Sequence, residues 1–222
     1  MIVLPRLYPI LDAGCFPNAL DLITAAEELA AAGCTLMQYR NKSGNSRVIL
    51  EQARELRRLF SSQSQNTHFS QNQGEVGHPL SARLIMNDRA DLCLAAEFDG
   101  LHVGQDDLSP EAVRRIIGSD RWMGVSTHNP EQLQQADLTS SDYLAIGPVF
   151  ATSSKDKPDP VVGLDGVRRA RALTRKPLVA IGGITRSNAA SVIEAGADAV
   201  AVISDLIRDP RKSAEEFFRI LR

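Results

Sequence analysis

The sequence has little of what a disulfide-linked, membrane-spanning or secreted protein needs. Its 222 residues include three cysteines, Cys15, Cys34 and Cys93, which are widely spaced and form no CxxC pair. Neither a disulfide framework nor a zinc knuckle is therefore indicated. No run of 18 apolar residues occurs, and the N-terminal MIVLPRLYPILD has neither a basic segment nor a small-residue cleavage site. We therefore expect a cytoplasmic protein with no membrane segment.

A large excess of charge of either sign is also missing. Lys and Arg number 25 and Asp and Glu number 27, which gives a formal net charge of −2. Such a chain has no bulk basic field with which to hold a nucleic acid or an anionic membrane surface. Because 43% of the residues are hydrophobic, the chain can still bury a sizeable core. We expect a folded domain whose partners include neither nucleic acid nor membrane.

Short apolar segments alternate with amphipathic helical segments eight times along the chain. Segments such as Leu178–Ile181 are apolar at every position, which is typical of parallel strands covered on both faces. Eight strand–helix units in a chain of this length favour a (β/α)₈ TIM barrel of the α/β class over an open doubly wound sheet. We predict one domain over residues 1–222, with strands at 7–12, 35–40, 83–88, 100–104, 122–127, 143–149, 177–183 and 199–204. The intervening helices are expected at 18–32, 46–60, 90–97, from Ser109-Pro110 onward, and at 130–138, 164–174, 187–195 and 214–221.

Two segments interrupt this alternation. Residues 63–80 (QSQNTHFSQNQGEVGHPL) are polar and rich in Gln and Asn, and we interpret them as a surface insertion without an assigned function. Residues 150–163 (FATSSKDKPDPVVG) follow the sixth strand. In this fold the chemistry takes place at the C-terminal ends of the strands, so this second segment is expected at the functional end.

The ends of the last two predicted strands have the layout of a phosphate site. Gly182 and Gly183 follow the seventh strand and Ser204 follows the eighth. Glycines let backbone N–H groups approach an anion, and TIM barrels frequently bind phosphate after strands seven and eight. A glycine pair can also simply turn the chain, but its position together with Ser204 favours phosphate binding.

Two carboxylates end neighbouring strands of the predicted barrel. Asp88 follows the third strand and Asp107 the fourth, and adjacent strands lie about 4.8 Å apart. Two carboxylates with few other protein ligands suit Mg²⁺, which keeps waters and binds substrate phosphates. Each could instead be an acid near a helix N-terminus, Asp88 beside Arg89 and Asp107 before Ser109. The spacing leaves both interpretations open.

Three cations are predicted at the same end of the barrel. Arg40, Lys42 and Lys155 together suggest a ligand with several negative charges, such as a pyrophosphate. A diphosphate site beside a separate phosphate site implies two phosphorylated small-molecule substrates. The histidines are less informative: His102 is expected to be a hydrogen-bonded interior residue, and His128 has no companion at metal-ligand spacing.

The sequence resembles the thiamine phosphate synthase (thiamine phosphate pyrophosphorylase) family over nearly its whole length, apart from the insertion. The motifs that carry the resemblance are specific as a set, although none is specific alone. They are QYRNK at 38–42, MNDRADLCLAA at 86–96, GLHVGQDDLSP at 100–110, GVSTHN at 124–129, GPVFATSSK at 147–155, AIGGIT at 180–185 and AGADAVAVIS at 195–204.

The resemblance implies a (β/α)₈ transferase of thiamine biosynthesis, which joins hydroxymethylpyrimidine diphosphate to a hydroxyethylthiazole phosphate and releases pyrophosphate with Mg²⁺. It implies that the pyrimidine and its diphosphate are held by Gln38, Arg40, Lys42, Asn87, Ser126 and Lys155. Magnesium would be bound by Asp88 and Asp107, and the thiazole phosphate by Thr152, Ser154, Gly183, Ile203 and Ser204. Arg40, Lys42, Ser126 and Lys155 are the expected catalytic residues, and the assembly could be a homodimer.

The chemistry of these parts suggests a dissociative substitution, in which the departing pyrophosphate gains charge and an electron-rich aminopyrimidine stabilises the carbocation. The family often has Pro-Thr-x-Thr-Lys after the sixth strand, whereas this chain has ATSSK at 151–155. Two alternatives stay open at the sequence level. One is a thiazole tautomerase-like isomerase of the same fold, which would not need the carboxylate pair. The other is a non-catalytic sensor of a phosphorylated metabolite.

Overall fold

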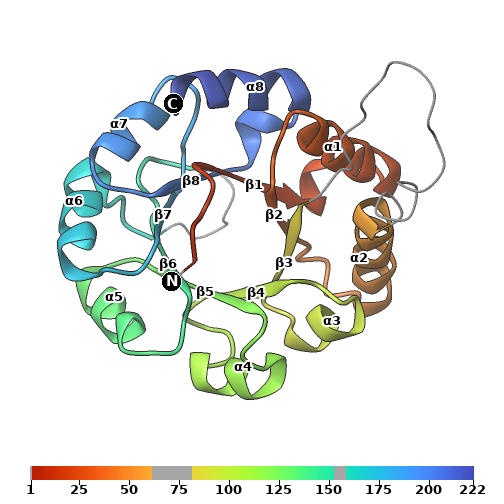
Figure 1. Ribbon diagram of the computed structural model, residues 1–222, viewed down its shortest axis with the longest axis horizontal. Coiled ribbons are helices and arrows are strands. Elements are labelled where there is room, and N and C mark those ends of the chain that lie inside the picture. Colours follow the sequence, from red (N-terminus) through yellow and green to blue (C-terminus); the bar gives the residue numbers. More distant parts are fainter. Residues whose placement is uncertain (1, 62–81, 153–158) are drawn as a thin grey trace, which may run out of the picture.

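Eight segments of the chain are buried at nearly every position, and each forms a strand that pairs with a parallel neighbour on both edges (Figure 1). The computed structural model describes residues 2–61, 82–152 and 159–222. Its strands close into one barrel in chain order, which confirms the predicted fold class. They are β1 (Leu7–Asp12), β2 (Leu36–Arg40), β3 (Arg83–Asn87), β4 (Gly100–Val103), β5 (Trp122–Thr127), β6 (Tyr143–Ile146), β7 (Leu178–Ile181) and β8 (Ala199–Val202).

A helix follows each strand and packs on the outside of the ring (Figure 1). Side-chain caps begin several of them: Asn18 accepts from the Asp21 N–H, and Ser109 from the Ala112 N–H. The helices are α1 (Ala19–Ala31), α2 (Ser46–Ser61), α3 (Ala90–Ala95), α4 (Pro110–Ile117), α5 (Pro130–Asp137), α6 (Gly163–Leu173), α7 (Ala189–Glu194) and α8 (Pro210–Ile220), with short 3₁₀ turns η1 (Ala13–Cys15) and η4 (Ser204–Leu206).

The final helix begins earlier than the sequence pattern predicts, at Pro210 instead of 214. Asp209 caps it by accepting from the Lys212 N–H at 3.2 Å, and proline tolerates the first helical position because no N–H is needed there. The predicted insertion at 63–80 lies outside the described residues. Within the described residues, no helix combines the length and apolarity that crossing a membrane requires.

The apolar side chains form two layers. The larger layer fills the space between the strands and the helices, where Leu101 and Val113 are fully buried. The smaller layer fills the inside of the barrel at the N-terminal ends of the strands, where Leu36 and Ile85 pack with Leu4 from the segment before β1. That segment crosses this end of the ring (Figure 1). The barrel is therefore closed by apolar side chains at one end.

Every second residue of a strand points inward, and at the opposite end of the barrel several of these inward residues are polar. Along β2 the inward positions run Leu36, Gln38, Arg40, and along β3 they run Ile85, Asn87. The inward face of these two strands thus changes from apolar to polar toward the C-terminal end. This change confines polar chemistry to the C-terminal end of the barrel, which we call the mouth.

An aspartate directly before each of β4, β6 and β8 joins that strand to the preceding one at the N-terminal end of the barrel. Each of these three carboxylates accepts one hydrogen bond from a backbone N–H of the preceding strand and one from an arginine of the helix that comes before that preceding strand. The three sets are Asp99 with Leu84 and Arg57, Asp142 with Met123 and Arg114, and Asp198 with Leu178 and Arg171, with distances of 2.7–2.8 Å. The repeat joins β3 to β4, β5 to β6 and β7 to β8.

Because these contacts lie at the N-terminal end of the barrel, removing one of them should lower the stability of the fold without changing the mouth. Asp142→Ala leaves the buried Met123 N–H without its acceptor and removes the carboxylate partner of Arg114, so we expect a loss of about 2 kcal/mol in the free energy of unfolding. Urea denaturation followed by circular dichroism measures it. The matched control is Asp165→Ala, which removes an exposed pair with Arg168 and should cost less than about 0.5 kcal/mol. Equal effects of the two variants would contradict the structural role of Asp142.

Candidate functional site

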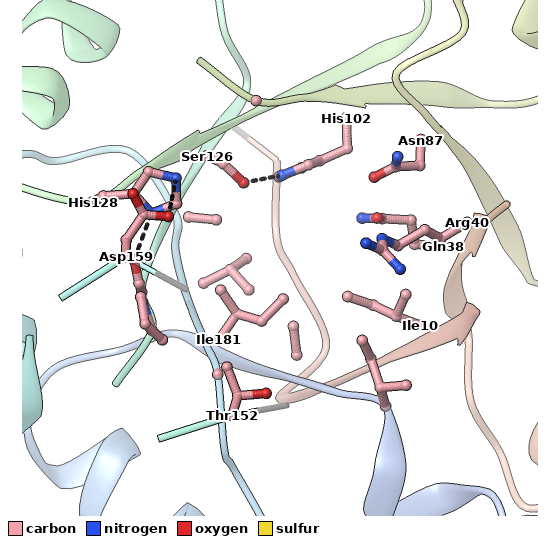
Figure 2. A pocket seen from close by; sticks show the side chains of 18 of the residues that line it. Ile10, Gln38, Arg40, Asn87, His102, Ser126, His128, Thr152, Asp159 and Ile181 are labelled. Carbon is pink, nitrogen blue, oxygen red and sulfur yellow. Dashed lines mark hydrogen bonds and ion pairs between the residues drawn. The ribbon is translucent and has the colours of Figure 1, made fainter. Parts of the chain in front are cut away.

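A pocket of about 420 Å³ opens at the mouth and is lined by residues from all eight strands. Its size suits small molecules. Figure 2 shows its side chains: Gln38, Arg40 and Asn87 lie on one wall, and Ser126, His128 and Asp159 face them across the cavity. The walls near β7 and β8 are apolar, with Ile181 labelled in the view.

Most of the residues selected from the sequence line this one pocket. They are Gln38, Arg40, Lys42, Asn87, Asp88, Asp107, Ser126, Thr152, Gly183, Ile203 and Ser204. The remaining two, Ser154 and Lys155, lie outside the described residues. The residues come together because each follows or ends a strand at the same end of the closed barrel.

The two described cations of the mouth are paired with carboxylates. Arg40, at the end of β2, forms an ion pair with Asp12 at the end of β1. Asp12 is nearly buried, and it also accepts from the Gly14 N–H at 3.1 Å. Lys42 forms an ion pair with Asp88. Sequence reasoning missed Asp12, although its position at a strand end is the signal that selected the other residues.

The two carboxylates predicted to converge are neighbours in the pocket. Burial and the adjacent Asp88 together raise the pKa of Asp107 above its ordinary value. Asp107 accepts from the Gly104 N–H at 2.8 Å. The Asp88 N–H donates to the His102 carbonyl at 2.8 Å, which holds Asp88 in a left-handed conformation with φ of 61°. A cation between these carboxylates would relieve their repulsion.

Asp88 directly precedes Arg89, the N-cap of α3, as the alternative interpretation expected, but its carboxylate pairs with Lys42. Arg89 instead pairs with Asp91 and donates to the Ser46 hydroxyl at 2.9 Å. Among the described residues, no group of three or more His, Cys, Asp and Glu side chains is arranged to hold a metal ion. The donor set at the mouth is therefore limited to the Asp88–Asp107 pair, which fits Mg²⁺ better than Zn²⁺, because zinc takes three or four protein ligands.

The loop after β7, where a phosphate site was predicted, has a backbone conformation that requires glycine. Gly182 and Gly183 have φ of 99° and 63°, a region that favours glycine. A Cβ on Gly183 would lie 2.5 Å from the Ala151 carbonyl oxygen, so this position admits no side chain. Asn188 donates to the Gly183 carbonyl at 3.0 Å and accepts from the Thr185 N–H at 2.8 Å. The loop thus keeps its shape without a ligand.

An arginine joins this loop to the turn after β8. The Arg186 N–H and Nε donate to Asp205 Oδ2 at 2.7 and 3.0 Å, and its Nη2 donates to Oδ1 at 2.8 Å. Arg186 also pairs with Glu216 of α8. Since Gly183 precedes Arg186 and Ser204 precedes Asp205, this bridge sets the separation of the two halves of the predicted phosphate site.

Two histidines, His102 and His128, line the pocket, although the sequence did not predict either of them to be functional. His102 is hydrogen-bonded on both ring nitrogens, to the Tyr143 hydroxyl at 3.1 Å and to Ser126 Oγ at 2.8 Å. Burial lowers its pKa to about 4, so the ring is neutral at pH 7. His128 Nδ1 donates to the Gly147 carbonyl at 2.6 Å, and its Nε2 lies 3.5 Å from Asp159 Oδ2. No local spacing could have indicated these partners, which come from other strands and loops.

Comparison with known proteins gives consistent results. The family model described as thiamine monophosphate synthase matches residues 7–206. The thiamine-phosphate synthase of Koribacter versatilis is 57% identical over 221 residues, covering 98% of this chain and 96% of that protein. That of Chloroflexus aurantiacus is 41% identical over 202 residues, covering 91% and 85%. The solved structure of thiamine phosphate pyrophosphorylase from Pyrococcus furiosus superposes with a TM-score of 0.79 at 30% identity, covering 97% and 95%.

The bridge between the two loops predicts a binding effect. Asp205→Ala removes the carboxylate that holds Arg186, so the loop after β7 and the turn after β8 should separate more freely. We expect the Kd for inorganic phosphate, measured by NMR titration of the backbone amides, to rise about tenfold. The control is Arg211→Ala, which removes an exposed pair with Glu215 on α8 and should leave the Kd unchanged. An unchanged Kd in Asp205→Ala would show that the bridge does not shape the site.

Proposed function

This chain belongs to the thiamine monophosphate synthase family, and we propose that its pocket joins a hydroxymethylpyrimidine diphosphate to a hydroxyethylthiazole phosphate and releases pyrophosphate. The chain is a transferase of thiamine biosynthesis. The observation that carries the assignment to this pocket is that one cavity combines a carboxylate pair, two cations and a glycine-lined loop. These groups match a diphosphate and a separate phosphate.

The wall formed by β2, β3 and β5 is proposed to hold the pyrimidine diphosphate. Arg40 and Lys42 supply positive charge for the two phosphates, and their present partners are carboxylates that a diphosphate can replace. Gln38, Asn87 and Ser126 present amide and hydroxyl groups to the ring. Lys155, which lies outside the described residues, is proposed to add a third cation.

Asp88 and Asp107 are proposed to hold Mg²⁺. Their proximity raises the pKa of Asp107, after burial, through the neighbouring carboxylate, and a divalent cation removes that repulsion. A bound Mg²⁺ would stabilise the negative charge that the departing pyrophosphate gains. Lys42 already contacts Asp88, so Mg²⁺ and the Lys42 ammonium group would both contact the diphosphate.

The thiazole phosphate is proposed to bind on the other side of the mouth. Gly183 offers its backbone N–H in a conformation that only glycine adopts easily. Ile203 and Ser204 end β8 beside it, and Thr152 lies on the loop after β6. Ser154, outside the described residues, is proposed to contribute a second hydroxyl from the same loop. The Arg186 bridge holds these parts together.

The chain's contribution to the reaction is positioning and electrostatic stabilisation. Arg40 and Lys42 lie where charge develops as the carbon–oxygen bond to the diphosphate breaks. The electron-rich aminopyrimidine can carry the resulting positive charge, and the thiazole nitrogen then attacks it, so no protein nucleophile is required. Holding the two substrates side by side converts a two-molecule encounter into a reaction within one complex. We propose a dissociative substitution on these grounds.

The isomerase and sensor alternatives are not supported. The relatives at 57% and 41% identity are both named as thiamine-phosphate synthases. Neither an isomerase of a thiazole phosphate nor a sensor has a use for the Asp88–Asp107 pair beside Lys42.

One experiment tests the proposed reaction directly. The purified protein is mixed with the pyrimidine diphosphate and the thiazole phosphate, with Mg²⁺ or with excess chelator, and the released pyrophosphate is measured. We expect pyrophosphate in equal amount to the coupled product only when both substrates and Mg²⁺ are present. Release without the thiazole phosphate would indicate a hydrolase, and release in chelator would remove the metal from the proposal.

The carboxylate pair gives a second prediction. Asp88→Ala and Asp107→Ala each remove one proposed metal ligand, so we expect kcat to fall by about a hundredfold or more, since metal stabilisation of the leaving group is worth several kcal/mol. The urea midpoint should change little because both side chains lie at the mouth. Asp91→Ala is the control, because Asp91 pairs with Arg89 on the surface. Wild-type rates of pyrophosphate release in either mouth variant would contradict the assignment.

A further inference from the structure

Five side chains from five different strands form one hydrogen-bonded chain across the inside of the barrel, which we call the relay. It begins at Gln38, whose Nε2 donates to the Tyr8 hydroxyl at 3.1 Å. The Tyr8 and Tyr143 hydroxyls are 3.0 Å apart. Tyr143 lies 3.1 Å from His102 Nδ1, and His102 Nε2 lies 2.8 Å from Ser126 Oγ. Figure 2 shows this last contact at the edge of the pocket.

The inner members of the relay are buried and uncharged. Tyr8 and Tyr143 are 1% and 0% exposed, and His102 is 7% exposed. Burial raises the pKa of both tyrosines above the ordinary value. At neutral pH each hydroxyl therefore carries its hydrogen, and the hydrogen bonds of the imidazole decide which of its two nitrogens is bare.

The amide of Gln38 sets the direction in which these hydrogens point. An amide nitrogen can only donate, so the Tyr8 oxygen accepts from it and the Tyr8 hydrogen is left for Tyr143. The Tyr143 hydrogen then goes to His102 Nδ1. Any other order leaves a fully buried hydroxyl hydrogen without an acceptor, which costs free energy. Nδ1 is then bare, and the ring hydrogen is on Nε2, where it is donated to Ser126.

A glycine makes room for the central contact of the relay. Gly124 occupies the inward position of β5 that precedes Ser126. A Cβ there would lie 2.1 Å from Tyr143 Cζ and 2.4 Å from His102 Nδ1. The hydrogen bond between Tyr143 and His102 therefore passes through space that any other residue would fill. The lack of a side chain at Gly124 therefore also supports the contact between Tyr143 and His102.

We propose that the relay holds His102 as its Nε2–H tautomer and so makes the Ser126 hydroxyl a hydrogen-bond donor toward the pocket. Because the Ser126 oxygen accepts from His102, its own hydrogen is free to point at a ligand. Tyr8, Tyr143 and His102 act through Ser126 and are positioning residues.

The consequence for substrate choice rests on the proposed function. A donor at Ser126 matches a ring nitrogen with a free lone pair, as in an aminopyrimidine. The 4-oxo counterpart of that ring carries a hydrogen on the adjacent nitrogen, so it would have to bind the second lone pair of Ser126 Oγ and would leave the Ser126 hydrogen without a ring acceptor. The relay therefore favours the amino form over the oxo form of the pyrimidine.

The first test determines the tautomer of His102 in the wild-type protein and needs no substrate. The protein is labelled with ¹⁵N-histidine, and the ring nitrogens of His102 are assigned by their loss in His102→Gln. At pH 7 we expect a protonated Nε2 and a bare Nδ1. A proton on Nδ1, or an even mixture of the two forms, would overturn the proposal, because the hydrogen bonds of the relay would then point the opposite way or have no fixed direction.

The second test breaks the relay. Tyr143→Phe removes the hydroxyl that donates to Nδ1, so His102 should become a mixture of tautomers while the fold, checked by urea denaturation, is retained. Tyr39→Phe is the matched control: Tyr39 is an equally buried tyrosine on the outer face of β2, whose hydroxyl donates to Gln52 Oε1 at 2.6 Å. It should leave His102 unchanged. A pure Nε2–H form in Tyr143→Phe would show that the relay does not set the tautomer.

The third test measures selection among substrates. In Tyr143→Phe the KM for the aminopyrimidine diphosphate should rise about tenfold with a smaller change in kcat, and the preference over the 4-oxo analogue should fall by about the same factor. An unchanged preference would contradict the role in selection. Since the tautomer is measured without substrate, a failure of the proposed reaction, seen as no pyrophosphate release by the wild type, is distinguishable from a failure of the relay.

Discussion

Every strand of the barrel is hydrogen-bonded to a parallel neighbour on both edges, and this closure determines where the polar residues can lie. Inward positions recur every second residue, so a strand that begins with an inward leucine and ends with an inward arginine, as β2 does, presents them at opposite ends of one channel. Apolar residues close the N-terminal end, with Leu4 among them. Eight strand ends are thereby directed into a single mouth, which is why residues distant in sequence share one pocket.

Charge at the mouth is arranged in pairs. Arg40 lies against Asp12, and Lys42 lies against Asp88. The Lys42–Asp88 pair is partly open to water, and such pairs contribute little to stability, so exchanging its carboxylate for a phosphate costs little. The pairs nevertheless hold the cations at the pocket before a ligand arrives, which reduces the ordering that binding requires. These pairs also place cations at the pocket of a nearly neutral chain, as the proposed diphosphate site requires.

The interior below the mouth contains neutral polar groups, whereas the mouth itself contains charged ones. A buried hydroxyl or imidazole is tolerated only when its hydrogens have partners, and the contacts among Gln38, Tyr8, Tyr143 and His102 provide them. Such a chain is directional, unlike an ion pair. The pocket therefore combines a charged outer part, suited to phosphates, with an uncharged inner part, suited to recognising the ring of a substrate.

Local pattern alone determined the eight strand–helix units and the polar residues after each strand, because burial on both faces and helical periodicity are properties of neighbouring residues. It also selected Asp88, Asp107 and Gly183. Tertiary structure alone decided that Arg40 meets Asp12 and that Tyr8 meets Tyr143, a residue 135 positions away. Contacts across a barrel depend on the stagger of its strands and on empty space such as that at Gly124. Neither the stagger nor the space is encoded by local spacing, so His102 could be identified as an interior residue but not as part of the site.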